Sequence, residues 1–263
     1  MSLTTNDGLR HALSRGAIAL SIAFAVSAPA AAFEPQHLER LRATKACEGC
    51  DLSGAPLRGA DLPGARLAGA NLVRADLRGA NLAEADLERA ALQEADLDDA
   101  NLQRANLVSA ELGGAKLRRA DLRQAVLRGA TAAEADLSEA RLEQAYLVKA
   151  DFTGAVLAGA DLTGATARDL RLFRARLARA ILTRAELWGA DLRRADLADA
   201  DLRDANLRAV DLTGADLARA QIAGANLRNA CICNTVMPDG RTEVSGCRAC
   251  DRPRTPDSGE KPR

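Results

Sequence analysis

The stretch DLSGAPLRGADLPGARLAGANLVRADLRGA (51–80) opens a five-residue unit that repeats without a register slip as far as Ala230, thirty-six times in all. Reading every fifth residue from Leu52 gives leucine except at Ala132, Phe152, Ala167 and Ile222. Reading every fifth residue from Ala55 gives alanine except at Leu170 and Val210. A repeat of this regularity has to be interpreted before any local motif.

A period of five fits neither a helix nor a flat strand. In an α-helix the successive leucines would spread around the whole cylinder, and in a strand they would alternate between the two faces. All of them can point inward only if the chain turns a corner at every unit. The repeat therefore predicts an all-β solenoid with leucine and alanine inside and the other three positions outside.

The charged residues indicate how many units make one coil. Residues that stack in adjacent coils are expected to carry opposite charges, and this holds best at a spacing of twenty. That spacing predicts four units per coil and nine four-sided coils, a rod about 43 Å long at the usual strand spacing. The matched pairs include Asp96 with Lys116, Asp98 with Arg118, Asp99 with Arg119, and Asp121 with Arg141.

The repeated A(D/N)LXX pattern over residues 51–230 resembles the pentapeptide-repeat family. The resemblance implies a right-handed quadrilateral β-helix, and it implies no activity, because function resides in particular sites rather than in a fold. The flanking stretches TKACEGCDLSGA (44–55) and CNTVMPDG (233–240), the latter followed by SGC (245–247), resemble exported members of the family.

The ends of the chain predict export and capping. Residues 1–32 resemble a secretory signal peptide, with a basic start, an apolar run over 16–26 and small residues before the expected cleavage after Ala32. Residues 33–50 predict a cap helix followed by a cysteine pair, and 251–263 predict a disordered tail. The expected location is the periplasm, the exterior or an equivalent lumen, without stable membrane insertion after cleavage.

All six cysteines lie at the ends, so a rod of this length allows one N-terminal pair, Cys47 with Cys50, and three C-terminal pairings. An exported protein is expected to oxidise them into structural disulfides. The family resemblance implies Cys233 with Cys247 and Cys231 with Cys250, within a C-terminal cap over 231–250. The alternative is a zinc site formed by these four C-terminal cysteines.

The amino-acid composition limits the classes of function that the sequence predicts. The formal net charge is zero and only 2% of residues are aromatic, which predicts no strong field to attract nucleic acid. The aspartates recur by repetition, without the differing environments that separate an acid from a base. The sequence therefore predicts no enzyme and no cofactor.

One stripe of the outer surface is apolar and aromatic. Trp188 has Arg168 and Arg208 at spacings of twenty, and Tyr146 and Val148 lie close by. Guanidinium groups stacked on the indole are expected here. Because exposed tryptophan and arginine often anchor interfaces, the stripe is a candidate binding site for a partner protein.

A second candidate surface is an arginine-rich stretch of the repeat. Arg171, Arg174, Arg176 and Arg179 lie between Arg168 and Arg184 and suggest an anion or partner patch. The preferred interpretation is a solvated ladder in which the next coil neutralises the arginines through Asp191, Asp196, Asp199 and Asp204. In the interior, Leu170 is expected to compensate for Ala167, whereas Ala132 is expected to leave a cavity or a local contraction.

These features favour an exported, non-enzymatic scaffold that binds a protein through a flat face, as a monomer or as an end-to-end or face-to-face dimer. One alternative is a DNA mimic that binds a topoisomerase, which the balanced charge and the signal peptide argue against. The other is a zinc or thiol-redox function at the cysteine-rich caps.

Overall fold

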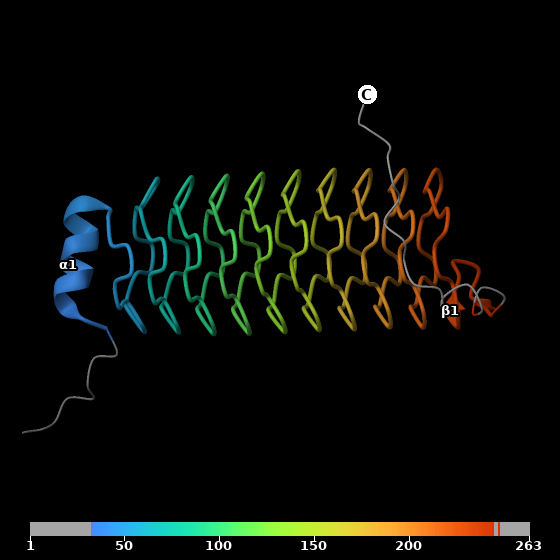
Figure 1. Cartoon of the computed structure of the whole chain (residues 1–263), viewed down its shortest axis with the longest axis horizontal. Helices are drawn as coiled ribbons and strands as arrows, with labels where there is room; N and C mark the ends of the chain where they lie inside the picture. Colours follow the sequence, from blue (N-terminus) through green and yellow to red (C-terminus); the bar gives the residue numbers. More distant parts are fainter. Residues whose placement is uncertain (1–32, 245–246, 248–263) are drawn as a thin grey trace, which may run out of the picture. The chain divides into compact units, whose positions relative to one another are not determined.

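Neighbouring coils are joined by parallel bridges between residues twenty apart. The computed structural model describes residues 33–244 and 247, all within the compact unit Ala31–Arg263. The bridges run from the pair Ala46–Arg66 to the pair Asp216–Val236. They stack the coils side by side along a rod (Figure 1), which confirms four units per coil.

Most units donate three backbone hydrogen bonds to adjacent coils. In the first unit, the N–H of Leu52 donates to the carbonyl of Asn71 at 2.7 Å, and the N–H of Gly54 donates to Val73 at 2.8 Å. Asn71 in turn donates its N–H to the carbonyl of Cys50 at 2.8 Å. Because the backbone groups are satisfied between coils, a chain with almost no long strands still forms a continuous sheet on every side.

The corners are tight turns whose third residue is left-handed. The N–H of Ala55 donates to the carbonyl of Leu52 at 3.0 Å, and φ at the intervening Gly54 is 68°. The fourth residue of every unit, as far as Asn229, has positive φ, and arginine, glutamate and aspartate often occupy it. Each non-glycine residue there costs about 1 kcal/mol, which the hydrogen bond from its own N–H to the next coil helps to offset.

Helix α1 (Pro35–Thr44) lies against the first coil. Its proline stands at the first turn, where the missing N–H costs nothing, and the helix ends at the left-handed Lys45, whose N–H donates to Leu41 at 2.8 Å. Leu38 and Leu41 are buried against the rod. No helix in the described part of the chain is long and apolar enough to cross a bilayer.

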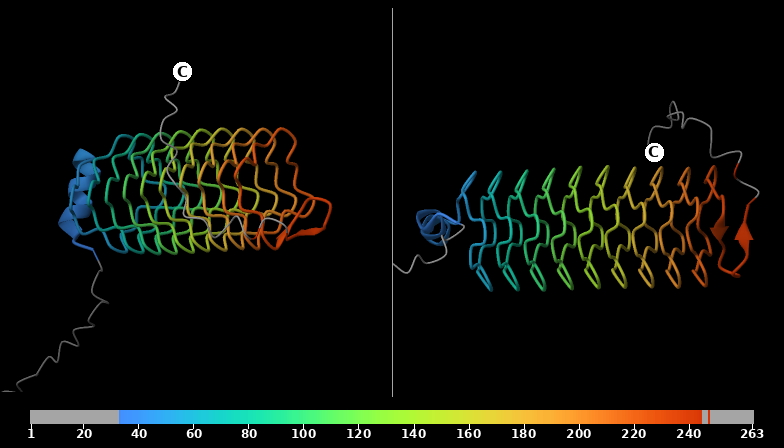
Figure 2. Two further views of the ribbon diagram at one scale, coloured as in Figure 1. Left: turned by 45° about the vertical axis from the view of Figure 1, so that its right-hand side comes forward. Right: turned by 90° about the horizontal axis from the view of Figure 1, so that it is seen from below.

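The other end carries a short antiparallel hairpin, β1 (Thr235–Val236) and β2 (Thr242–Glu243), seen from two sides in Figure 2. The Cys233–Cys247 disulfide joins its flanks, and a Cys47–Cys50 disulfide stands at the opposite end. Both pairings are confirmed, and a sulfur held in a disulfide is not a thiolate ligand for zinc. Cys231 is also disulfide-bonded. Its expected partner Cys250, the expected signal peptide 1–32 and the expected tail 251–263 lie outside the described residues.

The interior is filled by the leucine and alanine columns, whose members are almost all 0–1% exposed between Leu67 and Leu217. Ala132 was expected to have no larger side chain nearby to compensate for its small volume. In the same column, however, the next coil carries the larger Phe152. The two coils are adjacent there, since the N–H of Ala132 donates to the carbonyl of Asp151. Both side chains are 0% exposed. The larger Phe152 side chain is therefore a candidate to fill the space beside Ala132, which a comparison along the chain did not reveal.

Leu170 and Ala167 lie in one corner turn and are both fully buried. The turn hydrogen bond between them is 3.3 Å, and the same distance occurs at the other non-alanine position, between Val210 and Leu207. Most turns keep this bond at 2.9–3.1 Å. The larger side chains thus fit with a small local expansion of the corner.

The Ala132–Phe152 pair is tested by exchanging volume between adjacent coils. Phe152→Leu alone opens a cavity, and Ala132→Leu alone overpacks the core, each at a cost of about 1–3 kcal/mol. The double variant is expected to unfold within about 1 kcal/mol of the wild type, measured by guanidinium unfolding followed by circular dichroism. A double variant as unstable as the sum of the single variants would contradict the pairing.

Candidate binding surface

The rows of the rod bring together residues that are distant in the sequence. Side chains twenty residues apart lie on successive coils, and we call Ala68, Glu88, Val108, Arg128, Val148, Arg168, Trp188, Arg208 and Arg228 the Trp188 row. Its coils are joined by backbone bonds such as that from the N–H of Asp169 to the carbonyl of Trp188 at 3.0 Å. Tyr146 lies in the adjacent row and bridges to Val126 and Thr166.

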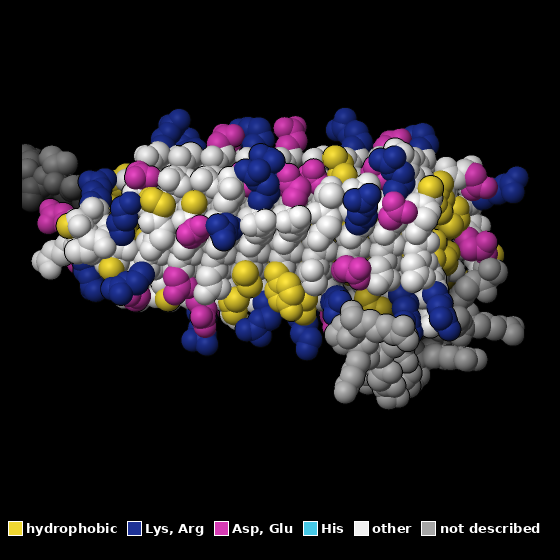
Figure 3. Space-filling model, turned by 90° about the horizontal axis from the view of Figure 1, so that it is seen from above, with side chains coloured by type: hydrophobic (Ala, Val, Ile, Leu, Met, Phe, Trp, Pro, Cys, Tyr) yellow, Lys and Arg dark blue, Asp and Glu magenta, His cyan; other side chains and the backbone are white. Residues whose placement is uncertain are grey.

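The structure places all five residues of the predicted partner site in these two rows. Tyr146 is 41% exposed, Arg168 is exposed, and Val148, Trp188 and Arg208 are half-buried. Figure 3 shows one face of the rod, on which hydrophobic side chains gather near the middle beside lysine and arginine side chains. The surface therefore offers apolar and cationic groups within reach of one another.

The expected stacking on Trp188 is not formed by Arg168 within the residues that the structure describes. Within the described residues, arginines instead contact the ring of Phe173: the guanidinium of Arg174 lies 5.0 Å and that of Arg193 5.5 Å from its centroid. Arg193 stands twenty residues after Phe173 and is held by two hydrogen bonds to Asp191, at 2.8 and 2.7 Å. The same spacing of twenty would have identified this contact in the sequence.

An aspartate at the first position of a unit orients an arginine at its third position. All four units that read Asp-Leu-Arg form this paired clamp, with two hydrogen bonds from the guanidinium to the carboxylate. The clamps join Arg78 to Asp76, Arg123 to Asp121, Arg193 to Asp191, and Arg203 to Asp201. In the units of Arg168 and Arg208 this position holds Thr166 and Asn206, so neither guanidinium is held by an aspartate of its own unit.

The arginine-rich stretch does not form a patch. Arg171 and Arg176 belong to different rows, bridged to Asp191 and Asp196 respectively, so successive arginines point to successive sides of one coil. Arg171 pairs with Asp151 of the preceding coil at 3.2 Å. Two of the four expected partners are occupied elsewhere, since Asp191 binds Arg193 and Asp199 binds Arg219. Among the described residues, Arg174, Arg176 and Arg179 form no ion pair.

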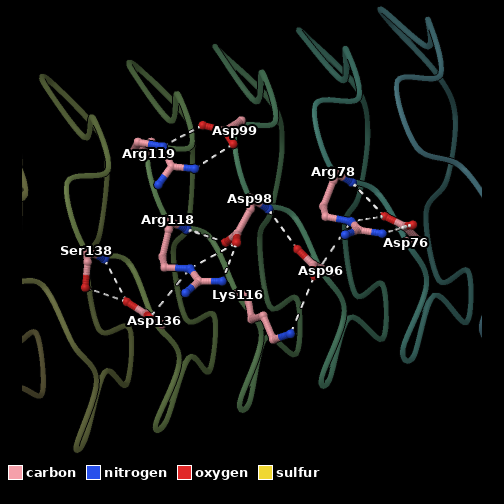
Figure 4. A network of polar contacts seen from close by, with 10 residues as sticks. All are labelled: Asp76, Arg78, Asp96, Asp98, Asp99, Lys116, Arg118, Arg119, Asp136 and Ser138. Carbon is pink, nitrogen blue, oxygen red and sulfur yellow. Dashed lines mark hydrogen bonds and ion pairs between the residues drawn. The ribbon is translucent and has the colours of Figure 1, made fainter.

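The predicted charge ladder does form nearer the N-terminus (Figure 4). Arg118 binds Asp98 at 2.6 Å, Arg119 binds Asp99 at 2.7 Å, and Lys116 lies 3.5 Å from Asp96. The hydrogen bonds from Arg119 lower the pKa of Asp99. Burial acts to raise the pKa of Asp121, but the hydrogen bonds from Arg123 outweigh it and the pKa is lowered.

Catalytic groups do not gather in the part of the chain that the structure describes. No three histidine, cysteine, aspartate or glutamate side chains converge there as a metal site. A hollow at the C-terminal end is lined by Ile222, Met237, Pro238 and the residues of the hairpin turn. Its other lining residues are Asp239, Arg241, Thr242 and Glu243.

A family model described as pentapeptide repeats matches the chain in overlapping segments over residues 50–169 and 171–237. The chain belongs to the pentapeptide-repeat family. Its members are generally non-enzymatic structural or binding proteins, and membership implies a right-handed quadrilateral β-helix. No curated protein sequence gave a match.

Solved structures of the family resemble the chain to different degrees. HetL from the cyanobacterium Nostoc sp. strain PCC 7120, involved in heterocyst differentiation regulation, is 35% identical over 78% of this chain and 97% of its own, with a TM-score of 0.52. Full-length QnrB1, a plasmid-mediated fluoroquinolone resistance protein, is 18% identical over 69% and 89%, with a TM-score of 0.27. A protein of the Arabidopsis thaliana thylakoid lumen is 31% identical over 38% and 66%, with a TM-score of 0.15.

The lowered carboxyl pKa values predict acid sensitivity. The pKa values of Asp76, Asp99, Asp121 and Asp201 are lowered in the folded chain, so their stabilisation is present above the unfolded value of about 3.9 and is lost as the pH falls through the lower folded values. Thermal unfolding is followed by circular dichroism at pH values from about 6 to about 2. The midpoint temperature is expected to decrease once the pH is below about 4. Asp121→Asn is expected to flatten part of this fall. An unchanged midpoint down to about pH 2 would contradict the prediction.

Proposed function

We propose that this protein is an exported, non-enzymatic scaffold that binds a partner protein through the surface around Trp188. The scaffold is a rod of nine four-sided coils, closed by α1 at one end and by the β1–β2 hairpin at the other. Its regular backbone presents side chains at fixed intervals, which suits recognition of a partner more than chemistry.

The observation that carries the proposal is the exposed ring of Tyr146, 41% accessible, in the row beside Val148 and Trp188. The fold does not need these residues, because the interior is already filled by leucine and alanine. Exposed aromatic side chains that lie next to arginine are common anchors of interfaces. Acidic and basic groups alternate along the ladders, which supports a protein partner over mimicry of a uniformly acidic DNA surface.

Two features support export. Residues 1–32 have the composition of a signal peptide. The Cys47–Cys50 and Cys233–Cys247 disulfides fit an oxidising compartment.

Export is tested by the intact mass of the protein isolated from its own cell, with and without reduction. We expect a chain that begins at Phe33 and gains the mass of six hydrogens on reduction. A full-length chain with free thiols would contradict export.

Partner binding is tested by replacing the anchors. Trp188→Ala and Tyr146→Ala are each expected to weaken capture of the partner by about thirtyfold or more, the loss typical of an interface hot spot. The measurement is quantitative pull-down from the compartment where the protein occurs, with titration of the captured partner. Ile181→Ala is the matched control, because Ile181 is 38% exposed in a different row. Equal capture by Trp188→Ala and the wild type would contradict the proposal.

A further inference from the structure

Three arginines of the Trp188 row differ in their ion pairing from most arginines in the N-terminal half of the rod. Arg128, Arg168 and Arg228 are exposed and form no ion pair within the described residues. By contrast, the arginines of the ladders and clamps are bound to carboxylates at 2.5–2.7 Å. These three arginines therefore present cationic groups that have no acidic partner in the described part of the chain.

The local sequence explains why these charges are not neutralised. The first position of their units holds Val126, Thr166 and Asn226, and none of these side chains can form the clamp that aspartate makes. Glu186 lies nearby in the adjacent row, but it already accepts a hydrogen bond from the amide of Asn206 at 2.8 Å. Asp169 follows Arg168 in the chain and forms no ion pair with it.

Apolar side chains separate the cationic groups. The row runs from Val108 through Arg128, Val148 and Arg168 to Trp188, so the two residue types alternate from coil to coil. Because coils are about 4.8 Å apart, successive arginines lie about 10 Å apart with an apolar contact between them. Tyr146 adds an exposed ring beside this alternation.

We propose that the Trp188 row binds an acidic segment of a partner protein, in which apolar side chains stand between the carboxylates. This inference rests on the proposed function and specifies the chemistry of the partner. Arginine matches carboxylates with paired hydrogen bonds, and the valines and the indole exclude water around these contacts. Single-stranded nucleic acid fits less well, since the row has one aromatic ring rather than the series on which successive bases stack.

The test uses the full chain and two labelled peptides, one of repeating Glu-Leu-Glu-Ala and one of repeating Gln-Leu-Gln-Ala, followed by fluorescence anisotropy. We expect the acidic peptide to bind at least about tenfold more tightly than the glutamine peptide, a difference of about 1.4 kcal/mol. Its affinity is expected to fall as salt is added, because exposed charges are screened.

Matched variants locate the binding. Arg168→Gln is expected to weaken binding of the acidic peptide about tenfold, whereas Arg179→Gln is expected to leave it unchanged. Arg179 is the suitable control because it is an exposed arginine without an ion pair in another row of the same coil. Circular dichroism establishes that both variants keep the fold.

Equal affinity for the two peptides, no binding of either, or an equal effect of the two arginine substitutions would overturn the inference. Tighter binding of a single-stranded DNA oligonucleotide than of the acidic peptide would also overturn it. In any of these cases, loss of partner capture by Trp188→Ala would leave the proposed function standing. Undiminished capture by Trp188→Ala would instead remove the proposed function itself.

Discussion

The stacking of coils through backbone hydrogen bonds is the constraint on which the rest of the structure depends. A bond such as that from Leu52 to Asn71 requires every coil to contain the same number of residues, because an insertion would displace all later bridges. The same constraint holds leucine above leucine and alanine above alanine. It also imposes a left-handed residue at each corner, even where the residue is arginine or glutamate.

The same stacking turns the surface into rows with a common environment. The neighbours of a side chain are the residues twenty positions before and after it, on the adjacent coils, and the flanking residues of its own unit. Whether an arginine is held in place depends on these few neighbours, and an aspartate two residues before it is enough, as at Arg203. Where that aspartate is replaced by threonine, as beside Arg168, the guanidinium remains available to another molecule.

The interior and the surface were predictable to different degrees. The coil of four units and the Cys47–Cys50 and Cys233–Cys247 pairs were anticipated from spacing and from the family resemblance, and the structure agrees. The position of Phe152 one coil after Ala132 was missed, although a comparison at twenty residues would have found it. The contact of Arg193 with Phe173 was missed for the same reason.

The sequence by itself determined the length of each coil and the contents of its core, because a leucine recurring at every fifth position can be buried in only one way. Only the tertiary structure decided which charged groups pair. A half-buried aspartate such as Asp191 has Arg193 in its own unit and Arg171 at the bridged position of the preceding coil, and the sequence pattern is the same for both pairings. The choice depends on the direction in which each side chain leaves the corner, as when Asp191 binds Arg193 and leaves Arg171 to Asp151.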